Sequence, residues 1–420
     1  MAKICLLTPG QPSINPRLVK EADALVEAGH EVHVLCSHYV AWADEADRAL
    51  LSIRPWTCTY VGGDQESIRY LWTRLRHGVT RRALAAWNLS SIFRKWALCR
   101  VSPELLRAAS DIGADLYIAH YSGALVAAAV AARRKHALLA FDAEDFESGY
   151  YNYETVPSVM DRLTELVERQ YLPTCCYVTA ASPGIAQAYR SKYAIPDPTT
   201  VLNVFPLAER PQQSGRTNPA GSLQLYWFSQ TIGLGRGLED VIRAMGKLKD
   251  CEIELHMRGR WSPNHRVMLL GLAGRAGVDV RRIFSYSPEP SGEMVRLSAM
   301  HDIGLAIEPS DSENHDLCIS NKIFTYLLAG NAIIATSTRG QRPIMETIGE
   351  AGFLYEPGDV DALARGLRLW YQDRSLVQQA RCKSWLWGTK QFNWDLEKKK
   401  LLQVVERALS KEMRAKSACG

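Results

Sequence analysis

Short hydrophobic runs alternate with amphipathic stretches along most of the chain. Residues 3–9 (KICLLTP) form the first apolar run, and residues 15–29 place apolar side chains at helical spacing and end at a glycine. Similar runs follow at 30–36, 114–120, 137–145, 176–182 and 199–204. Strands that alternate with helices are typical of a parallel, doubly wound sheet. The first part of the chain is therefore predicted to be an α/β domain.

A second α/β domain is predicted after a segment that is poor in hydrophobic residues. Residues 206–222 (PLAERPQQSGRTNPAGS) are rich in Pro, Gly, Ser and Gln, a composition typical of linkers. The alternation then resumes, with apolar runs at 223–229, 252–259, 282–287, 302–309, 331–337 and 352–357. We predict an N-terminal domain (1–205), a C-terminal domain (223–385) and a C-terminal segment (386–420). That segment is predicted to be helical to about residue 416 and could cross back to the first domain.

Composition and charge restrict the class of protein. The chain has 420 residues, of which 47% are hydrophobic and 23% charged, as in folded globular proteins, and its length suits two domains. The net charge of +5 is mild, and zinc-finger spacing and RNA-binding signatures are missing, so nucleic acid is not a predicted partner. The N-terminus does not resemble a signal peptide, and apolar stretches are too short to span a membrane. Ten cysteines without a CxxC pair predict reduced thiols in a cytoplasmic protein.

Two loops of the second domain could approach a phosphate. Gly233, Gly235 and Gly237 follow the strand at 223–229 and surround Arg236. Glycines let backbone N–H groups come close to an anion, and arginine adds charge and several donors. An ordinary glycine-rich turn is the alternative. Arg258 lies at the end of the next predicted strand, 252–259, in the sequence MRGRW. Its side chain could face a ligand or solvent.

A third phosphate-binding candidate is the segment 320–330 (SNKIFTYLLAG), which is predicted to be a helix that ends at Gly330. Ser320 is a candidate N-cap residue, and Asn321 and Lys322 lie in the first turn. A helix start carries unpaired N–H groups and the positive end of the dipole, so it attracts anions and disfavours a lysine. A bound anion would explain Lys322, and a stray surface lysine is the alternative. The P-loop motif and a G-x-G-x-x-G after the first strand are both absent from the sequence.

Six segments, taken in order, resemble the GT-B glycosyltransferases of family 4. They are INPRLVKEADALVEAGHEVHVL, LVERQYLPTCCYVTAASPGIAQAY, VLNVFPL, GLGRGLEDVIRAM, SNKIFTYLLAGNAIIAT and FNWDLEKKKLLQVVERAL. The resemblance implies two Rossmann-like domains that face each other across a cleft. It also implies transfer of a sugar, with retention, from a nucleotide sugar on the second domain to a glycan or lipid-linked acceptor on the first, in cell-surface polysaccharide or glycolipid biosynthesis.

The resemblance also implies which residues take part. Donor contacts are expected from Gly235, Arg236, Gly237, Arg258, Ser320, Asn321, Lys322 and Thr325, and acceptor contacts from the loop that holds Gly10, Asn15 and Arg17. The leaving diphosphate would be stabilised by Arg236, Lys322 and helix N–H groups. The resemblance therefore implies neither a metal ion nor a cofactor.

The chain departs from the family pattern at two places. The family signature carries two glutamates eight positions apart, the second touching the ribose, where this chain has Leu317 and Thr325. Glu313 and Asp316 are possible replacements. The family often has a histidine and then an acid after Asp-Ala, where this chain has Glu144 and Asp145. These carboxylates could bind acceptor hydroxyls or act as a base. Alternatively, Asp142 and Asp145 cap the next helix.

One basic stretch suggests a surface partner. Residues 69–100 contain eight Lys or Arg, no acid, and three interleaved tryptophans, Trp72, Trp87 and Trp96. Basic side chains attract anionic lipid headgroups, and tryptophan favours the interface. A peripheral site on the inner face of the cytoplasmic membrane is one interpretation, and a basic insertion packed on the first domain is the other.

Two functions other than sugar transfer fit the same fold. The chain could be a nucleotide-sugar epimerase or a non-catalytic scaffold.

Overall fold

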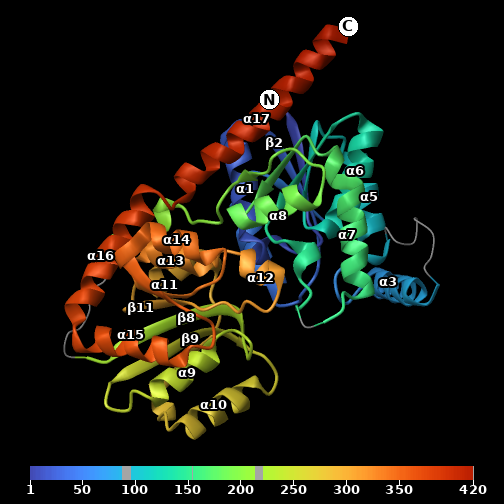
Figure 1. The fold of residues 1–420 in the computed structure, drawn as a ribbon. Coiled ribbons are helices and arrows are strands. Elements are labelled where there is room, and N and C mark those ends of the chain that lie inside the picture. The colour runs from blue at the N-terminus through green and yellow to red at the C-terminus, as the bar shows by residue number, and fades with distance from the viewer. Residues whose placement is uncertain (88–95, 154, 213–220, 420) are drawn as a thin grey trace. The chain divides into compact units, whose positions relative to one another are not determined.

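The computed structural model describes residues 1–87, 96–153, 155–212 and 221–419, which form two compact units (Figure 1). Unit 1 comprises residues 1–202 together with 398–420, and unit 2 comprises residues 203–397. The division lies near the predicted boundary at residue 205. Of the predicted C-terminal segment, residues 386–397 belong to unit 2 and the remainder to unit 1.

Unit 1 is built on a parallel sheet of seven strands in the order β3-β2-β1-β4-β5-β6-β7. The strands are β1 (Lys3–Leu7), β2 (Glu31–Ser37), β3 (Thr57–Val61), β4 (Leu116–His120), β5 (Leu138–Ala143), β6 (Tyr177–Ala180) and β7 (Thr199–Thr200). Six of them match the predicted runs. β3 was not predicted, because it is an edge strand whose sequence, TCTYV, alternates exposed and half-buried positions and lacks a continuous apolar run.

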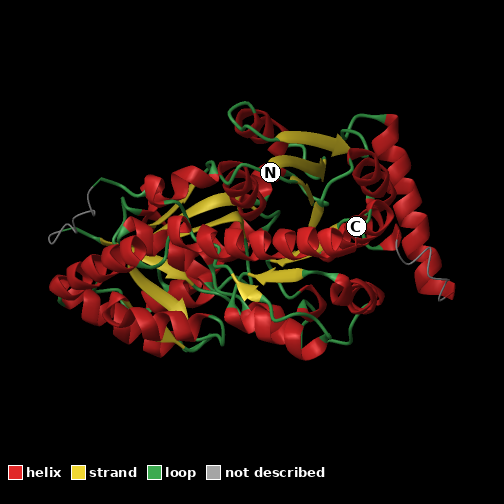
Figure 2. Ribbon diagram, turned by 90° about the horizontal axis from the view of Figure 1, so that it is seen from above, coloured by secondary structure: helices red, strands yellow, loops and turns green. Residues whose placement is uncertain are grey.

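Helices cover both faces of this sheet, as expected of a doubly wound fold (Figure 2). They are α1 (Pro16–Glu27), α2 (Ala43–Leu51), α3 (Ile68–Trp87), α5 (Ser102–Ile112), α6 (Ser122–Lys135), α7 (Val159–Tyr171) and α8 (Pro183–Lys192). α6 is the most deeply buried of them, and its many alanines let neighbouring elements approach closely. The central strands β1 and β4 are almost wholly buried, which explains why they read as continuous apolar runs.

Unit 2 is also built on a parallel sheet, with six strands in the order β10-β9-β8-β11-β12-β13. The strands are β8 (Leu223–Ile232), β9 (Ile253–Trp261), β10 (Ile283–Tyr286), β11 (Ile303–Ala306), β12 (Ala332–Thr336) and β13 (Gly352–Tyr355). The helices are α9 (Leu238–Gly246), α10 (His265–Ala276), α11 (Met294–Ser298), α12 (Glu313–Leu317), α13 (Asn321–Ala329), α14 (Gln341–Ile348), α15 (Val360–Gln372) and α16 (Arg374–Lys390). All six predicted strands are therefore confirmed. The strand order reverses between β8 and β11, which makes this the switch point of the sheet.

The predicted helix over residues 386–416 is interrupted. α16 ends at Lys390, and α17 (Trp394–Cys419) begins after a short break. Asn393 causes the restart, because its side-chain oxygen accepts from Leu396 N at 3.2 Å while its amide donates to the carbonyls of Gly388 and Thr389. None of the described helices is long and apolar enough to cross a bilayer.

A stack of aromatic and histidine side chains lies on one face of the unit 2 sheet. His256 packs on Phe284, with ring centroids 4.6 Å apart, and lies 4.8 Å from His301. His301 in turn stacks on Tyr226 at 4.3 Å. His256 and His301 are both buried, so each is favoured in its neutral form. Burial and the neighbouring His256 lower the pKa of His301 from 6.5 to about 4.

This shift predicts an acid sensitivity of unit 2. Between pH 6.5 and 4, His301 binds a proton in the unfolded chain but not in the folded one. The free energy of unfolding therefore falls as the pH drops through this range. The full shift corresponds to about 3 kcal/mol. Urea denaturation at pH 7.5, 6, 5 and 4 should give a shallower acid slope for His301→Asn than for the natural chain. Parallel slopes would contradict the prediction.

Candidate functional site

The first candidate site lies in unit 2, where the carboxyl ends of β8 and β11 meet at the switch point of the sheet. Open α/β sheets bind ligands in the crevice outside such a switch point. The loop after β8 carries the predicted glycines and Arg236, and the segment after β11 begins with Ile307 and Glu308. These two segments therefore border the expected ligand site of unit 2.

The glycine loop approaches the end of β11 closely. Gly237 has a φ of +77°, and a Cβ added there would lie 2.9 Å from Ile307 Cβ and 3.0 Å from its carbonyl oxygen. A larger residue would push the loop away from the strand. Arg236 is exposed, and its guanidinium donates to Ser229 Oγ at 3.1 Å. The loop thus presents an arginine at the switch point.

Lys322 meets a carboxylate at the same place. Its ammonium group lies 2.6 Å from Glu308 Oε1, and Ser320 Oγ donates to the same oxygen at 2.7 Å. Lys322 also lies over the ring of Trp227, 5.6 Å from the centroid. The Lys322 and Glu308 side chains are partly exposed, at 13% and 24%. The lysine is therefore held in place by an internal anion, yet it still reaches solvent.

Glu308 is the residue that the sequence analysis missed. Burial acts to raise its pKa, but the charge and hydrogen bond of Lys322 outweigh it, helped by Ser320 and by the charge of Arg236. The net pKa of Glu308 is lowered, so it is ionised at neutral pH. Two cations, Arg236 and Lys322, thus surround one carboxylate, and the group keeps a net charge of +1. The signal in the sequence was an acidic residue two positions after the end of a buried strand.

The start of α13 differs from the prediction in one respect. Ser320 occupies the N-cap position, but its hydroxyl donates to Glu308 and does not accept from a helix N–H, so the predicted side-chain cap is wrong. Asn321 is exposed at the first helical position. Thr325 is wholly buried and its hydroxyl donates to the carbonyl of Asn321, while Leu317 is buried as well. The family's two glutamate positions are thus buried in this chain.

The possible acidic replacements are held differently. Asp316 accepts from the backbone N–H of Arg339 at 3.0 Å and pairs with its guanidinium, while the Asp316 carbonyl accepts from Gly340 N at 2.7 Å. This carboxylate therefore fixes the loop between β12 and α14. Glu313 lies half-buried in the first turn of α12. A donor role for Glu313 and Asp316 stays a prediction.

Arg258 is used to join two strands. Its guanidinium donates to Tyr226 OH at 3.1 Å and to the carbonyl of Ser287 at 2.7 Å, and it lies over the ring of Tyr286. Its side chain is mostly buried. Because β9 continues to Trp261, Arg258 lies within the strand, where it links β9 to β8 and to the loop after β10; its predicted donor contact is not tested by this geometry.

The second candidate site lies in unit 1, at the ends of β4 and β5. Asp142 is buried and receives a two-pronged ion pair from Arg17, with Nε–Oδ2 at 2.6 Å and Nη2–Oδ1 at 2.7 Å. Arg17 also donates to the carbonyl of Val201 at 2.6 Å, and Thr179 donates to Asp142. Burial acts to raise the pKa of Asp142, but Arg17 lowers it overall. Asp142 thus joins α1, β5 and β6 and does not cap a helix.

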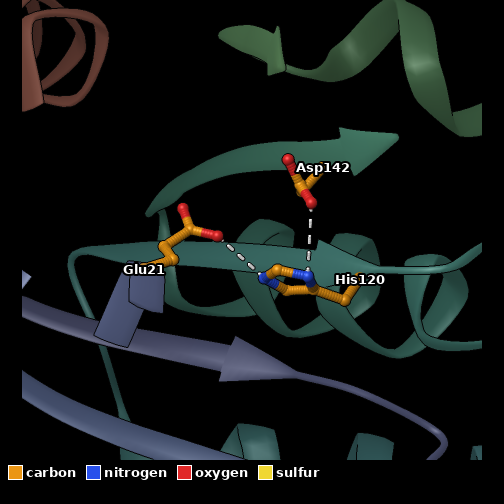
Figure 3. A group of neighbouring side chains, drawn as sticks. All are labelled: Glu21, His120 and Asp142. Atoms are coloured by element: carbon orange, nitrogen blue, oxygen red, sulfur yellow. Dashed lines mark ion pairs between the residues drawn. The ribbon is translucent and has the colours of Figure 1, made fainter. Parts of the chain in front are cut away.

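His120 extends this network toward a second carboxylate (Figure 3). Its Nε2 lies 2.8 Å from Glu21 Oε2, and its Nδ1 lies 3.4 Å from Asp142 Oδ2. Burial lowers the pKa of His120, but the two carboxylates outweigh burial and raise it. These three side chains are the described residues that could hold a metal ion. Because the two carboxylates face opposite nitrogens of one ring, and Arg17 already balances Asp142, the arrangement suits an ion-pair network better than a metal site.

Glu144 and Asp145, the carboxylates predicted for the acceptor side, directly follow β5, the strand that carries Asp142. Glu144 is partly exposed and accepts from Tyr121 OH at 2.9 Å, and Asp145 accepts from Tyr150 OH at 2.5 Å. Burial and the neighbouring Asp145 raise the pKa of Glu144. Two adjacent carboxylates with tyrosine donors can accept hydrogen bonds from ligand hydroxyls. Their geometry is thus compatible with the predicted roles.

The other predicted acceptor-side residues make internal contacts. The Asn15 side chain accepts from Leu18 N at 3.0 Å and so caps α1, and it is buried. Gly10 lies in the loop after β1, where its carbonyl accepts from Ser37 N at 3.0 Å. Arg17 is 3% exposed, which leaves its guanidinium inside the unit. These residues shape the loop, and an acceptor contact for them stays a prediction.

The chain resembles known proteins in sequence over part of its length and in fold over nearly all of it. Residues 17–203 match the family model of Glycosyltransferase Family 4. A search of curated proteins finds no match. A glycosyltransferase from Rickettsia africae ESF-5 superposes with a TM-score of 0.68 at 15% identity, covering 97% of this chain and 98% of that one.

Two further solved structures share this fold. HepE from Anabaena, solved in complex with UDP and glucose, gives a TM-score of 0.70 at 15% identity and covers 97% of this chain and 100% of its own. Sucrose-phosphate synthase from Thermosynechococcus elongatus gives 0.70 at 14% identity, with 98% and 100% covered. At such low identity these likenesses establish the fold.

Proposed function

We propose that this chain, whose residues 17–203 match the family model of Glycosyltransferase Family 4, is a glycosyltransferase and that its unit 2 binds a nucleoside-diphosphate sugar at the switch point of its sheet. The observation that carries the proposal is the meeting of Arg236 and Lys322 around Glu308 beside the start of α13. Two cations and a helix N-terminus form a site for a diphosphate. HepE binds UDP and glucose, so UDP is the first nucleotide to test.

The chemistry follows from this charge arrangement. A hydroxyl oxygen of the acceptor forms a bond to the anomeric carbon, and the bond from that carbon to the diphosphate oxygen breaks with its electron pair going to the phosphate. Arg236 and Lys322 stabilise the negative charge that develops on the leaving group, so a metal ion is not needed. The hydroxyl proton passes to the leaving phosphate on the same face, and the configuration is retained.

The acceptor side is assigned to unit 1. Glu144 and Asp145, with their tyrosine donors, bind hydroxyl groups of a glycan or of a lipid-linked sugar. Such an acceptor belongs to the biosynthesis of a cell-surface polysaccharide or glycolipid. Residues 69–100 bring unit 1 to the anionic membrane that carries it, which makes the enzyme peripheral on the inner face of that membrane.

A thermal-shift screen of the full chain tests the donor site. UDP, GDP, ADP, dTDP and CMP are added with and without EDTA, and a ligand of the native state raises the melting temperature. One diphosphate should give a clear rise that EDTA does not remove. A rise that disappears with EDTA would contradict metal-independent binding. The absence of a shift with every nucleotide would contradict the donor site itself.

A further inference from the structure

Helix α3 (Ile68–Trp87), blue in Figure 1, exposes an unusual set of hydrophobic side chains. Ile68, Leu71, Trp72, Leu75 and Val79 are all between 56% and 85% exposed. Their spacing of three and four residues places them on one side of the helix, in a stripe about 100° wide. We call these five residues the apolar stripe. Isolated exposed hydrophobic residues are common, but a continuous stripe marks an interaction surface.

The opposite side of α3 attaches the helix to unit 1. Thr73, Thr80 and Leu84 are buried on that side, and His77 lies 2.8 Å from the carbonyl of Ala97. An ordinary surface helix buries its apolar side and exposes its polar side. In α3 the larger apolar side chains face outward instead, so packing within unit 1 does not account for them.

The basic residues of this region divide into two groups. Arg76 makes a two-pronged pair with Glu104, both contacts at 2.7 Å. Arg100 donates to Thr73, to the Gly62 carbonyl and to the His38 carbonyl. These two arginines hold α3 in place. A second group, Arg69, Arg74, Arg81 and Arg82, is exposed on α3.

A groove lies beside the last two of these arginines. It is lined by Gly78, Arg81, Arg82 and the start of α7, residues 158–160, and encloses about 460 Å³. A capping box between Ser158 and Asp161 already takes up backbone N–H groups at the start of α7, so the positive charge of the groove comes from the two arginines. The groove therefore extends the positive surface from the flank of the apolar stripe to α7.

We propose that α3 lies flat in the surface of an anionic bilayer, with the apolar stripe inserted among the acyl chains and the four exposed arginines in contact with lipid phosphates. The inference deepens the membrane contact included in the proposed function, but it does not depend on catalysis. Charge complementarity selects this partner, because from Ile68 to Leu84 the helix carries four exposed positive charges and no acidic residue. The groove between α3 and α7 then receives a lipid headgroup.

Co-sedimentation of the full chain with vesicles tests the proposal. Vesicles of phosphatidylcholine alone are compared with vesicles that also contain phosphatidylglycerol, at low and high salt. The natural chain should sediment with the anionic vesicles and be released partly by salt. The double variant Trp72→Glu, Leu75→Glu should lower the partition coefficient at least about tenfold, because two inserted side chains become charged. Arg81→Glu with Arg82→Glu should lower it about fivefold for each positive charge removed.

Matched controls separate insertion from general changes of charge. Val267 on α10 of unit 2 is 76% exposed, so Val267→Glu places the same charge on a comparable exposed apolar residue of another helix. Arg275→Glu, also on α10, matches the arginine changes. Both controls should sediment like the natural chain. Circular dichroism and the nucleotide thermal shift should stay unchanged in every variant, which shows that the fold and the donor site are intact.

Three results would overturn the proposal. The natural chain could stay in the supernatant with anionic vesicles, or the α3 variants could sediment as well as the controls. Light scattering could instead show a dimer that the Trp72→Glu, Leu75→Glu variant abolishes, which would mean that a second copy covers the apolar stripe. A chain that binds a nucleotide but ignores vesicles would refute this inference and leave the donor site standing.

Discussion

Replacing Lys322 by alanine is expected to weaken the binding of a nucleoside diphosphate by roughly 10- to 100-fold. The loss has two parts. A charge-assisted hydrogen bond to phosphate contributes about 1.5–3 kcal/mol. Without the lysine, Glu308 also keeps its negative charge beside the phosphates with only Arg236 to offset it. Isothermal titration calorimetry with the nucleotide found in the thermal screen measures the change.

Glu308→Gln should have the opposite effect on the same measurement. The amide keeps the size of the side chain and can still accept from Lys322 and Ser320, but it removes one negative charge from the site. Diphosphate binding should therefore become several-fold tighter. Arg236→Ala should weaken binding, as Lys322→Ala does. If Glu308→Gln weakens binding as much as Lys322→Ala, then Glu308 contacts the ligand itself and does not simply hold the lysine.

Breaking the buried pair of Arg17 and Asp142 is expected to destabilise unit 1 by about 3–5 kcal/mol. Arg17→Ala leaves the Asp142 carboxylate buried without the guanidinium that lies 2.6 Å from it, and an uncompensated buried charge is costly. Thr179 and His120 compensate only in part. Urea denaturation, followed by circular dichroism at pH 7, measures the free energy of unfolding.

Two comparison variants make this prediction specific. Arg17→Met with Asp142→Leu removes both charges, so it should cost clearly less than Arg17→Ala alone. Arg281→Ala removes an arginine whose pair with Asp279 lies on the surface, and it should leave stability unchanged within error. Equal losses from Arg17→Ala and from the double variant would mean that the unpaired charge of Asp142 does not account for the loss.

The sequence by itself determined the class of fold and most of its strands. Central parallel strands are buried on both faces, so they appear as continuous apolar runs, and β1, β4 and β12 could be located in this way. Gly330 was correctly predicted to end α13, because its φ of +73° favours glycine. The loop with Arg236 could be singled out by its glycines, and Lys322 because a cation in the first turn of a helix is locally unusual. Such signals depend on neighbours in the chain.

The tertiary structure alone decided which partners these residues have. Ser320 looked like a helix cap, but Glu308, which is twelve residues earlier, competes for its hydroxyl. Arg17 looked available to an acceptor, yet Asp142 and Val201 hold it from positions more than a hundred residues away. The exposure of the apolar stripe on α3 was likewise invisible in the sequence, where it resembles the buried face of any amphipathic helix. Charge and burial depend on contacts between distant segments, and only the folded chain brings those segments together.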